Sequence, residues 1–85
     1  MQLDAINDAF VEARDEIEYA VEESETVYFE ESLKTAQEAV AEALGQFNDL
    51  LDSLDETERG KLQRSMGMKM EQLKAELHTV EQTHA

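Results

Sequence analysis

The sequence predicts an all-α protein, an antiparallel, up-down-up three-helix bundle in a single helical domain over residues 1–85. The chain has no proline and only three glycines, and it is rich in residues that lose little freedom in a helix. Apolar residues also recur at steps of three and four along three segments, so we expect helices at approximately 2–23, 28–54 and 56–82. A homodimeric bundle that shares helices between two copies is the alternative, since oligomerisation often stabilises a small core without disulfides.

The first expected helix carries a single apolar stripe. Its members alternate at steps of three and four: Leu3, Ile6, Phe10, Ala13, Ile17 and Ala20. Acidic residues stand between these positions and would face water. This pattern is typical of a helix with one buried face.

The stripe then loses its phase, which predicts a turn. Its continuation would need apolar residues at positions 24 and 31, but Ser24 and Glu31 stand there, and a new stripe begins at Phe29. We therefore expect a turn near residues 24–27, with Ser24 or Thr26 as the N-cap of the next helix. The alternative is one long helix that passes through this region with a stutter.

The second expected helix has a wider apolar arc than the first. Its main stripe contains Phe29, Leu33, Ala36, Val40, Ala43, Phe47, Leu50 and Leu54. Leu44 and Leu51 form a second row with Val40 and Phe47. Two rows indicate two packing neighbours, so this helix is expected in the middle of the bundle.

Two overlapping capping boxes mark the start of the third expected helix. Ser53 with Glu56, and Asp55 with Glu58, both have the required spacing. The stripe that follows is Leu62, Met66, Met70, Leu73, Leu77 and Val80.

Charge is distributed unevenly along the chain, whose formal net charge is −14. Residues 1–23 carry −7 and residues 24–54 carry −6, whereas residues 55–85 carry only −1, since they contain five bases: Arg59, Lys61, Arg64, Lys69 and Lys74. The third helix is thus expected to complement the other two electrostatically, in one chain or between two copies. Nucleic acids and anionic membranes should be repelled, whereas a protein partner with a basic surface would be attracted.

Several kinds of site are not expected. The chain has no cysteine, no glycine-rich phosphate loop and no calcium loop, and its two histidines, His78 and His84, lie near the C-terminus. We therefore predict no catalytic residue, no cofactor and no metal site. A carboxylate-based enzyme is the remaining catalytic alternative, and it would need a pocket that shifts a carboxyl pKa.

The sequence also favours an intracellular location. It has no run of 18 apolar residues, and its N-terminus lacks the pattern of a signal or transit peptide. With the absence of cysteine, this pattern predicts a cytoplasmic or nuclear protein that does not enter a membrane, unless a targeting segment was removed from the chain.

Six residues are candidates for a partner-binding surface: Tyr19, Tyr28, Phe29, Gly60, Gly67 and Met68. The aromatic residues surround the expected turn, and two adjacent helical residues cannot both face one core, so one aromatic is expected to be exposed as an interface anchor. The glycines share a helix face and could admit another helix. Met68 lies off the apolar stripe and suits an adaptable surface. Capping of the bundle end, tolerated glycines and core filling are the structural alternatives.

The expected function is therefore a non-catalytic protein–protein interaction module, such as an adaptor, assembly factor or small subunit. The alternative is an acidic regulator that masks a basic, nucleic-acid-binding surface of its partner.

Overall fold

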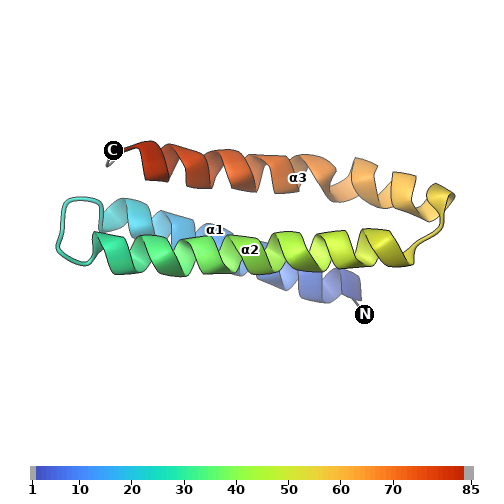
Figure 1. Cartoon of the computed structure of the whole chain (residues 1–85), viewed down its shortest axis with the longest axis horizontal. Coiled ribbons are helices and arrows are strands. Elements are labelled where there is room, and N and C mark those ends of the chain that lie inside the picture. Colours follow the sequence, from blue (N-terminus) through green and yellow to red (C-terminus); the bar gives the residue numbers. More distant parts are fainter. Residues whose placement is uncertain (1, 84–85) are drawn as a thin grey trace.

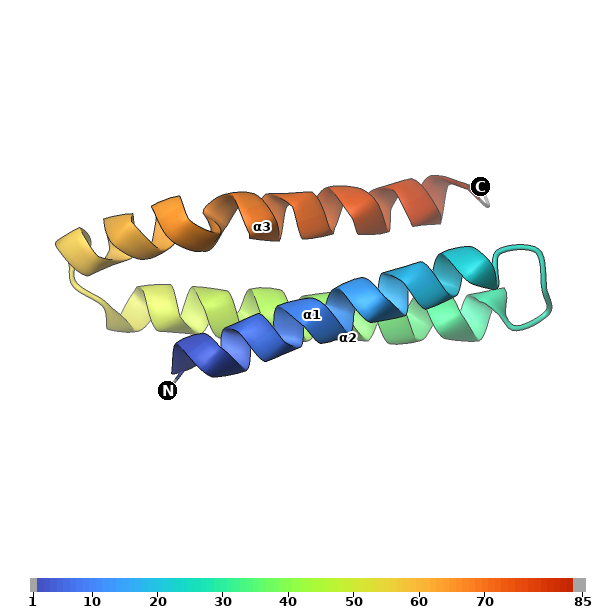
Figure 2. The same cartoon turned by 180° about the vertical axis from the view of Figure 1, so that it is seen from behind.

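The computed structural model describes the backbone of residues 2–83 and confirms the all-α fold. Three helices follow one another, α1 (Gln2–Glu22), α2 (Phe29–Ser53) and α3 (Glu56–Thr83). Helices α1 and α3 run in one direction and α2 in the other, so that the described part of the chain forms an elongated up-down-up bundle of 46 × 21 × 15 Å (Figures 1 and 2). The chain reverses direction after α1, which excludes the continuous helix with a stutter.

The turn between α1 and α2 is built differently from the expected cap. Tyr28 is the N-cap of α2 and makes no side-chain capping bond, so neither Ser24 nor Thr26 holds that position. The Thr26 hydroxyl instead accepts a hydrogen bond from the Tyr28 amide at 3.1 Å, and the Thr26 amide donates to the Glu23 carbonyl at 2.9 Å. The expected cap was wrong because the tight turn places Thr26 two residues before the N-cap, where its hydroxyl reaches the N-cap amide itself rather than an amide within the helix.

The connection between α2 and α3 has a definite cap at Asp55. The Glu58 amide donates to Asp55 Oδ1 at 2.8 Å, whereas the Ser53 hydroxyl donates to the Leu50 carbonyl within α2. Asp55 is thus the capping residue of the two predicted candidates. Arg59 then donates to the carbonyls of Leu51 and Leu54 at the C-terminal end of α2, and the Leu51 carbonyl also accepts from the Leu54 amide.

Helices α1 and α2 pack tightly through small residues. Both bury alanines at their shared interface: Ala9, Ala13, Ala20, Ala36 and Ala43. Small side chains let two helix backbones approach more closely, since the interaxial distance depends on the side chains at the contact. Helices α1 and α2 accordingly have the closest backbone approach of the three helix pairs.

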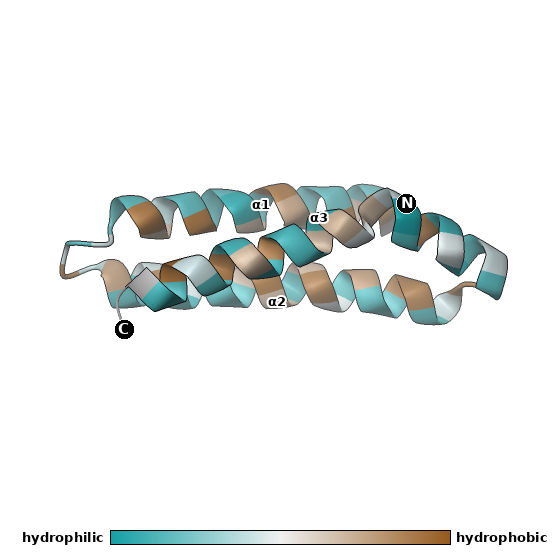
Figure 3. Ribbon diagram, turned by 90° about the horizontal axis from the view of Figure 1, so that it is seen from above, coloured by the Kyte–Doolittle hydropathy of each residue, from teal (hydrophilic) through white to brown (hydrophobic). Residues whose placement is uncertain are grey.

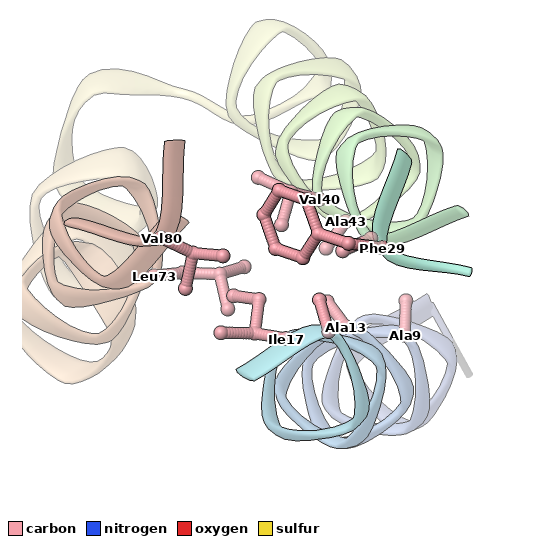
Figure 4. Packing of buried hydrophobic residues seen from close by; sticks show 10 residues of the cluster. Ala9, Ala13, Ile17, Phe29, Val40, Ala43, Leu73 and Val80 are labelled. Carbon is pink, nitrogen blue, oxygen red and sulfur yellow. The ribbon is translucent and has the colours of Figure 1, made fainter. Parts of the chain in front are cut away.

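Helix α3 packs on this pair through larger side chains. Its buried residues are Leu62, Met66, Met70, Leu73 and Val80, and Leu77 is half-buried, as the stripe predicted. Leu73 and Val80 point toward Ile17 of α1 (Figure 4). Helix α2 contacts both other helices, although α1 and α3 also contact each other. Brown, apolar bands therefore lie along the facing sides of the helices (Figure 3).

The core is almost entirely apolar. Most stripe residues of α1 and α2 are buried or half-buried, and Leu3 at the start of α1 is the exposed one. Ser32 is the one buried polar side chain among the residues whose burial the structure describes. Within that part of the chain, no buried side-chain nitrogen or oxygen lacks a hydrogen-bond partner.

Candidate functional site

Large exposed apolar side chains gather at the end of the bundle where α1 turns into α2. Seven such side chains occur among the described residues, and four lie within ten positions of one another: Tyr19, Val21, Val27 and Tyr28. Val27 is 90 % exposed and Tyr28 is 62 % exposed. Val21 lies about 200° from Tyr19 around α1 and faces α3 instead, so we reserve the name turn-end surface for Tyr19 and Tyr28, which line one hollow.

The two tyrosines of the turn-end surface lie on either side of one hollow. Tyr19 from α1 and Tyr28 from the start of α2 line a depression of about 230 Å³, together with Glu16, Glu31, Ser32 and Thr35. The hollow thus combines two aromatic rings with polar and acidic neighbours.

Phe29 does not belong to this surface. Its side chain is only 4 % exposed and points between the helices (Figure 4), so it is a core residue and cannot meet a partner. Successive helical residues point about 100° apart, which is why burial of Phe29 leaves the adjacent Tyr28 outside. Of the adjacent aromatic pair, Tyr28 is the exposed member.

Met68 and Gly67 lie on a different surface. Met68 is 83 % exposed and borders an α2–α3 groove of about 380 Å³, which Gly67, Leu44 and Phe47 also line. The structure therefore does not bring Met68 together with the tyrosines.

The glycines of α3 show no close approach by another helix. A Cβ atom added at Gly67 would meet only Gln63 Oε1 at 3.2 Å, and one added at Gly60 would meet Arg64 Nη1 at 3.6 Å. Both neighbours are flexible side chains of α3 itself. Within this chain, the pair thus does not serve helix–helix packing.

A further groove, which the sequence did not single out, runs between α1 and α3 at the same end as the turn. It encloses about 570 Å³, and its lining comprises Arg14, Ile17, Glu18, Val21, Glu22, Glu76, Thr79 and Val80. Ile17 and Val80 are buried at its base, and Val21 is an exposed wall. One signal was present in the sequence, since Val21 follows Ile17 by one helical turn and stands beside the stripe.

The expected electrostatic docking of α3 is not seen. The one ion pair between helices in the described part of the chain joins Arg14 of α1 to Glu76 of α3 at 3.2 Å, so the base lies on the acidic helix. Lys61 and Lys74 pair with acids of α3 itself. For a single chain the expectation was wrong, because neighbouring charges three positions apart on α3 are within reach of each other, whereas the helices meet through apolar faces. Docking between two copies stays a prediction.

The other α3 bases have different roles. Arg59 caps α2, and Lys69 Nζ lies 5.7 Å from the centre of the Phe10 ring, a cation–π contact with α1. Most acids of α1 and α2 are thus left without a basic partner among residues 2–83.

The local acidity changes the ionisation of Tyr19. The negative charge of Glu23, with smaller contributions from desolvation and from Glu22 and Glu16, raises the pKa of the Tyr19 phenol above its ordinary value of 10.0. The phenol therefore stays neutral and remains a hydrogen-bond donor across the physiological pH range.

The described residues contain no recognisable catalytic or metal centre. Every Asp and Glu side chain whose burial is described is at least partly exposed. No group of three or more His, Asp or Glu residues within residues 2–83 could hold a metal ion, and His84 lies outside the described residues. No helix of this part of the chain is long and apolar enough to cross a membrane.

Comparison with known proteins identifies the family. Residues 1–82 match the family described as the embryogenesis-like protein helical domain. The embryogenesis-like protein of Arabidopsis thaliana is 56 % identical over 75 residues, which cover 88 % of this chain and 42 % of that relative. The chain thus spans less than half the length of this relative, and no solved structure matches it. The chain belongs to the embryogenesis-like protein helical-domain family.

Proposed function

We propose that this chain is a non-catalytic protein–protein interaction module, which serves as an adaptor, assembly factor or small subunit. The observation that carries the proposal is the turn-end surface, where the exposed side chains of Tyr19 and Tyr28 line one hollow. Single exposed apolar residues are ordinary, but a group at one end of a rigid bundle is typical of a recognition surface. Tyrosine is especially suited to this role, because it joins a large apolar ring to a hydrogen-bonding hydroxyl.

A second candidate function is an acidic regulator that covers a basic, nucleic-acid-binding surface of its partner. It is favoured by the acids of α1 and α2 that have no basic partner within the described residues. Binding of this kind would weaken steeply with added salt, because exposed charges are screened. An interface made mainly by the tyrosines would depend on salt much less.

Affinity capture from cell extract with paired variants tests the main proposal. The double variant Tyr19→Ala/Tyr28→Ala should lose specifically captured proteins, because it removes both rings from the turn-end surface. Val11→Ala is the matched control, since Val11 is also exposed on α1 but lies away from the turn. Circular dichroism should show unchanged helix content in both variants.

Met68→Ala asks whether the α2–α3 groove is the binding surface instead. Loss of captured proteins with Met68→Ala alone would move the interface to that groove. If the double tyrosine variant captured the same proteins as the unmodified chain, the turn-end surface would not be the interface.

A further inference from the structure

We propose that the α1–α3 groove at the turn end binds a basic amphipathic helix of a partner protein. Apolar residues of that helix would lie against Ile17, Val21 and Val80, and its Lys or Arg residues would lie beside Glu18 and Glu22. The inference rests on the proposed interaction function and names the chemistry of the partner.

The shape and lining of the groove favour a helix. Helices α1 and α3 run side by side in the same direction (Figures 1 and 2), so their side chains form two parallel ridges with a groove between them. The base is apolar and Val21 is half exposed along one wall. An amphipathic helix laid in such a groove would cover these apolar atoms with one face.

The groove is closed toward the middle of the bundle. Arg14 Nη2 donates to Glu76 Oε2 at 3.2 Å across the seam, and Gln72 Nε2 donates to the same oxygen at 3.3 Å. Lys69 on Phe10 covers the seam further along. The accessible length therefore lies between this ion pair and the turn end.

The charge around the groove selects a basic occupant. Glu18 and Glu22 stand four residues apart on α1 and line the same wall, and neither takes part in an ion pair within the described residues. On the opposite wall, Glu76 is already engaged by Arg14. Two cations spaced one turn apart on a partner helix would match the two free carboxylates.

The ends of the helices add to the same negative field. Both α1 and α3 have their C-terminal ends at this end of the bundle (Figure 1), and neither has a basic residue in its last turn. The negative ends of two helix dipoles are thus left without a cation from their own helices, and the positive end of α2, which begins at the same end of the bundle, offsets only part of their field. A second copy of this chain is disfavoured as the occupant, because each copy has a net charge of −14.

Binding of synthetic helices, measured by fluorescence anisotropy, tests the proposal. The probe is an amphipathic peptide with Leu on one face and Lys at four-residue spacing beside it, and its counterpart carries Glu in place of Lys. We expect the full chain to bind the Lys peptide and not the Glu peptide. Val21→Lys should weaken binding by about tenfold or more, because it adds a like charge to the apolar wall.

Matched variants distinguish binding in the groove from attraction to the overall negative charge of the chain. Val11→Lys makes the same charge change on an exposed site of α1 outside the groove and should alter affinity by less than about twofold. The pair Glu18→Gln/Glu22→Gln should weaken binding much more than Asp8→Asn/Glu12→Gln, which removes two exposed acids at the same spacing. If the groove variants and their matched controls lost equal affinity for the Lys peptide, the groove would not be the binding site, and the peptide would be held by the overall negative charge of the chain.

Two further outcomes would contradict the proposed binding of a basic helix in the groove. If the Glu peptide bound as tightly as the Lys peptide, the partner would not need to be basic. If light scattering showed a dimer that Val21→Lys dissociates, the groove would bind a second copy of the chain. Either result contradicts this inference and leaves the turn-end function standing if the tyrosine variants still lose their captured proteins. Failure of the tyrosine variants alone would show that the turn-end surface is not the interface and would leave the groove standing.

Discussion

The α1–α2 hairpin and helix α3 contribute to the bundle in different ways. The hairpin joins two acidic segments through buried alanines, which bring the helices together without large side chains. Helix α3 is nearly neutral overall and attaches through leucine and methionine side chains. The α1–α2 interface therefore depends on the small volume of its side chains, and the attachment of α3 depends on the apolar area of larger side chains.

This difference predicts which part of the molecule opens first. A buried alanine contributes little apolar area, so the hairpin alone gains limited hydrophobic stabilisation. Helix α3 supplies much of the missing apolar area, but its backbone lies less close to α1 and α2 than theirs lie to each other. We expect α3 to detach in partial opening events while the hairpin stays together more often.

The largest effect is expected from Leu73→Ala. Leu73 is fully buried on α3, and truncation of a buried leucine typically costs about 2–5 kcal/mol of unfolding free energy. Chemical denaturation measures the loss, and hydrogen exchange should show that amide protection falls more in α3 than in α1 or α2. Leu77→Ala, at a half-buried site on α3, should cost less. Equal loss of protection in all three helices would contradict the separate behaviour of α3.

Ala13→Leu tests the hairpin side of the comparison. Ala13 is fully buried between α1 and α2, so a larger side chain would push the two helices apart and cost about 1–3 kcal/mol. Ala41→Leu is the control, because Ala41 is exposed on α2 and should change stability little. Thermal unfolding of both variants measures the difference. An unchanged midpoint for Ala13→Leu would mean that the alanine interface is not closely packed.

The sequence predicted the backbone architecture better than the surface. The alternation of apolar residues is a local property of each helix, and it correctly placed Ile17, Phe47 and Leu73 in the core. The same alternation placed Phe29 in the stripe of the second helix, and its burial leaves the adjacent Tyr28 exposed. The hydrogen bonds of Thr26 in the turn, by contrast, follow no periodic pattern, and the sequence did not predict them.

The candidate site was predicted only in part for a related reason. Tyr19 and Tyr28 do line one hollow, but Met68 lies elsewhere, because its place around α3 depends on how that helix is rotated against the hairpin. The α1–α3 groove brings together residues about sixty positions apart, such as Arg14 and Glu76. Such proximity requires the packed arrangement and cannot be read from spacing within one helix.

Asp55→Ala should produce a moderate effect at the junction of the two regions. The substitution removes the acceptor of the Glu58 amide at the start of α3, and loss of an N-cap costs about 1 kcal/mol. Asp55→Asn keeps a side-chain acceptor while removing the charge, so it should retain most of the stability. Denaturant titration compares the two variants. If they lose equal stability, the charge rather than the hydrogen bond is what matters at this cap.

The smallest expected effect is a change in the Tyr19 pKa, which reports the negative charge of the α1–α2 hairpin close to this residue. In a Tyr28→Phe background Tyr19 is the only tyrosine, so ultraviolet absorption follows its phenol alone. Because the Glu23 charge is the main cause of the raised pKa, Glu23→Gln and added salt should each lower the Tyr19 pKa toward 10.0. The raised pKa means that folding favours the protonated phenol, so this contribution to stability is present below the unfolded pKa and is lost as the pH rises through the folded value. Lys74→Gln, a charge change on the distant α3 surface, should leave the Tyr19 pKa unchanged. If Lys74→Gln and Glu23→Gln changed the Tyr19 pKa equally, the electric field at Tyr19 would come from the whole bundle and not from the hairpin.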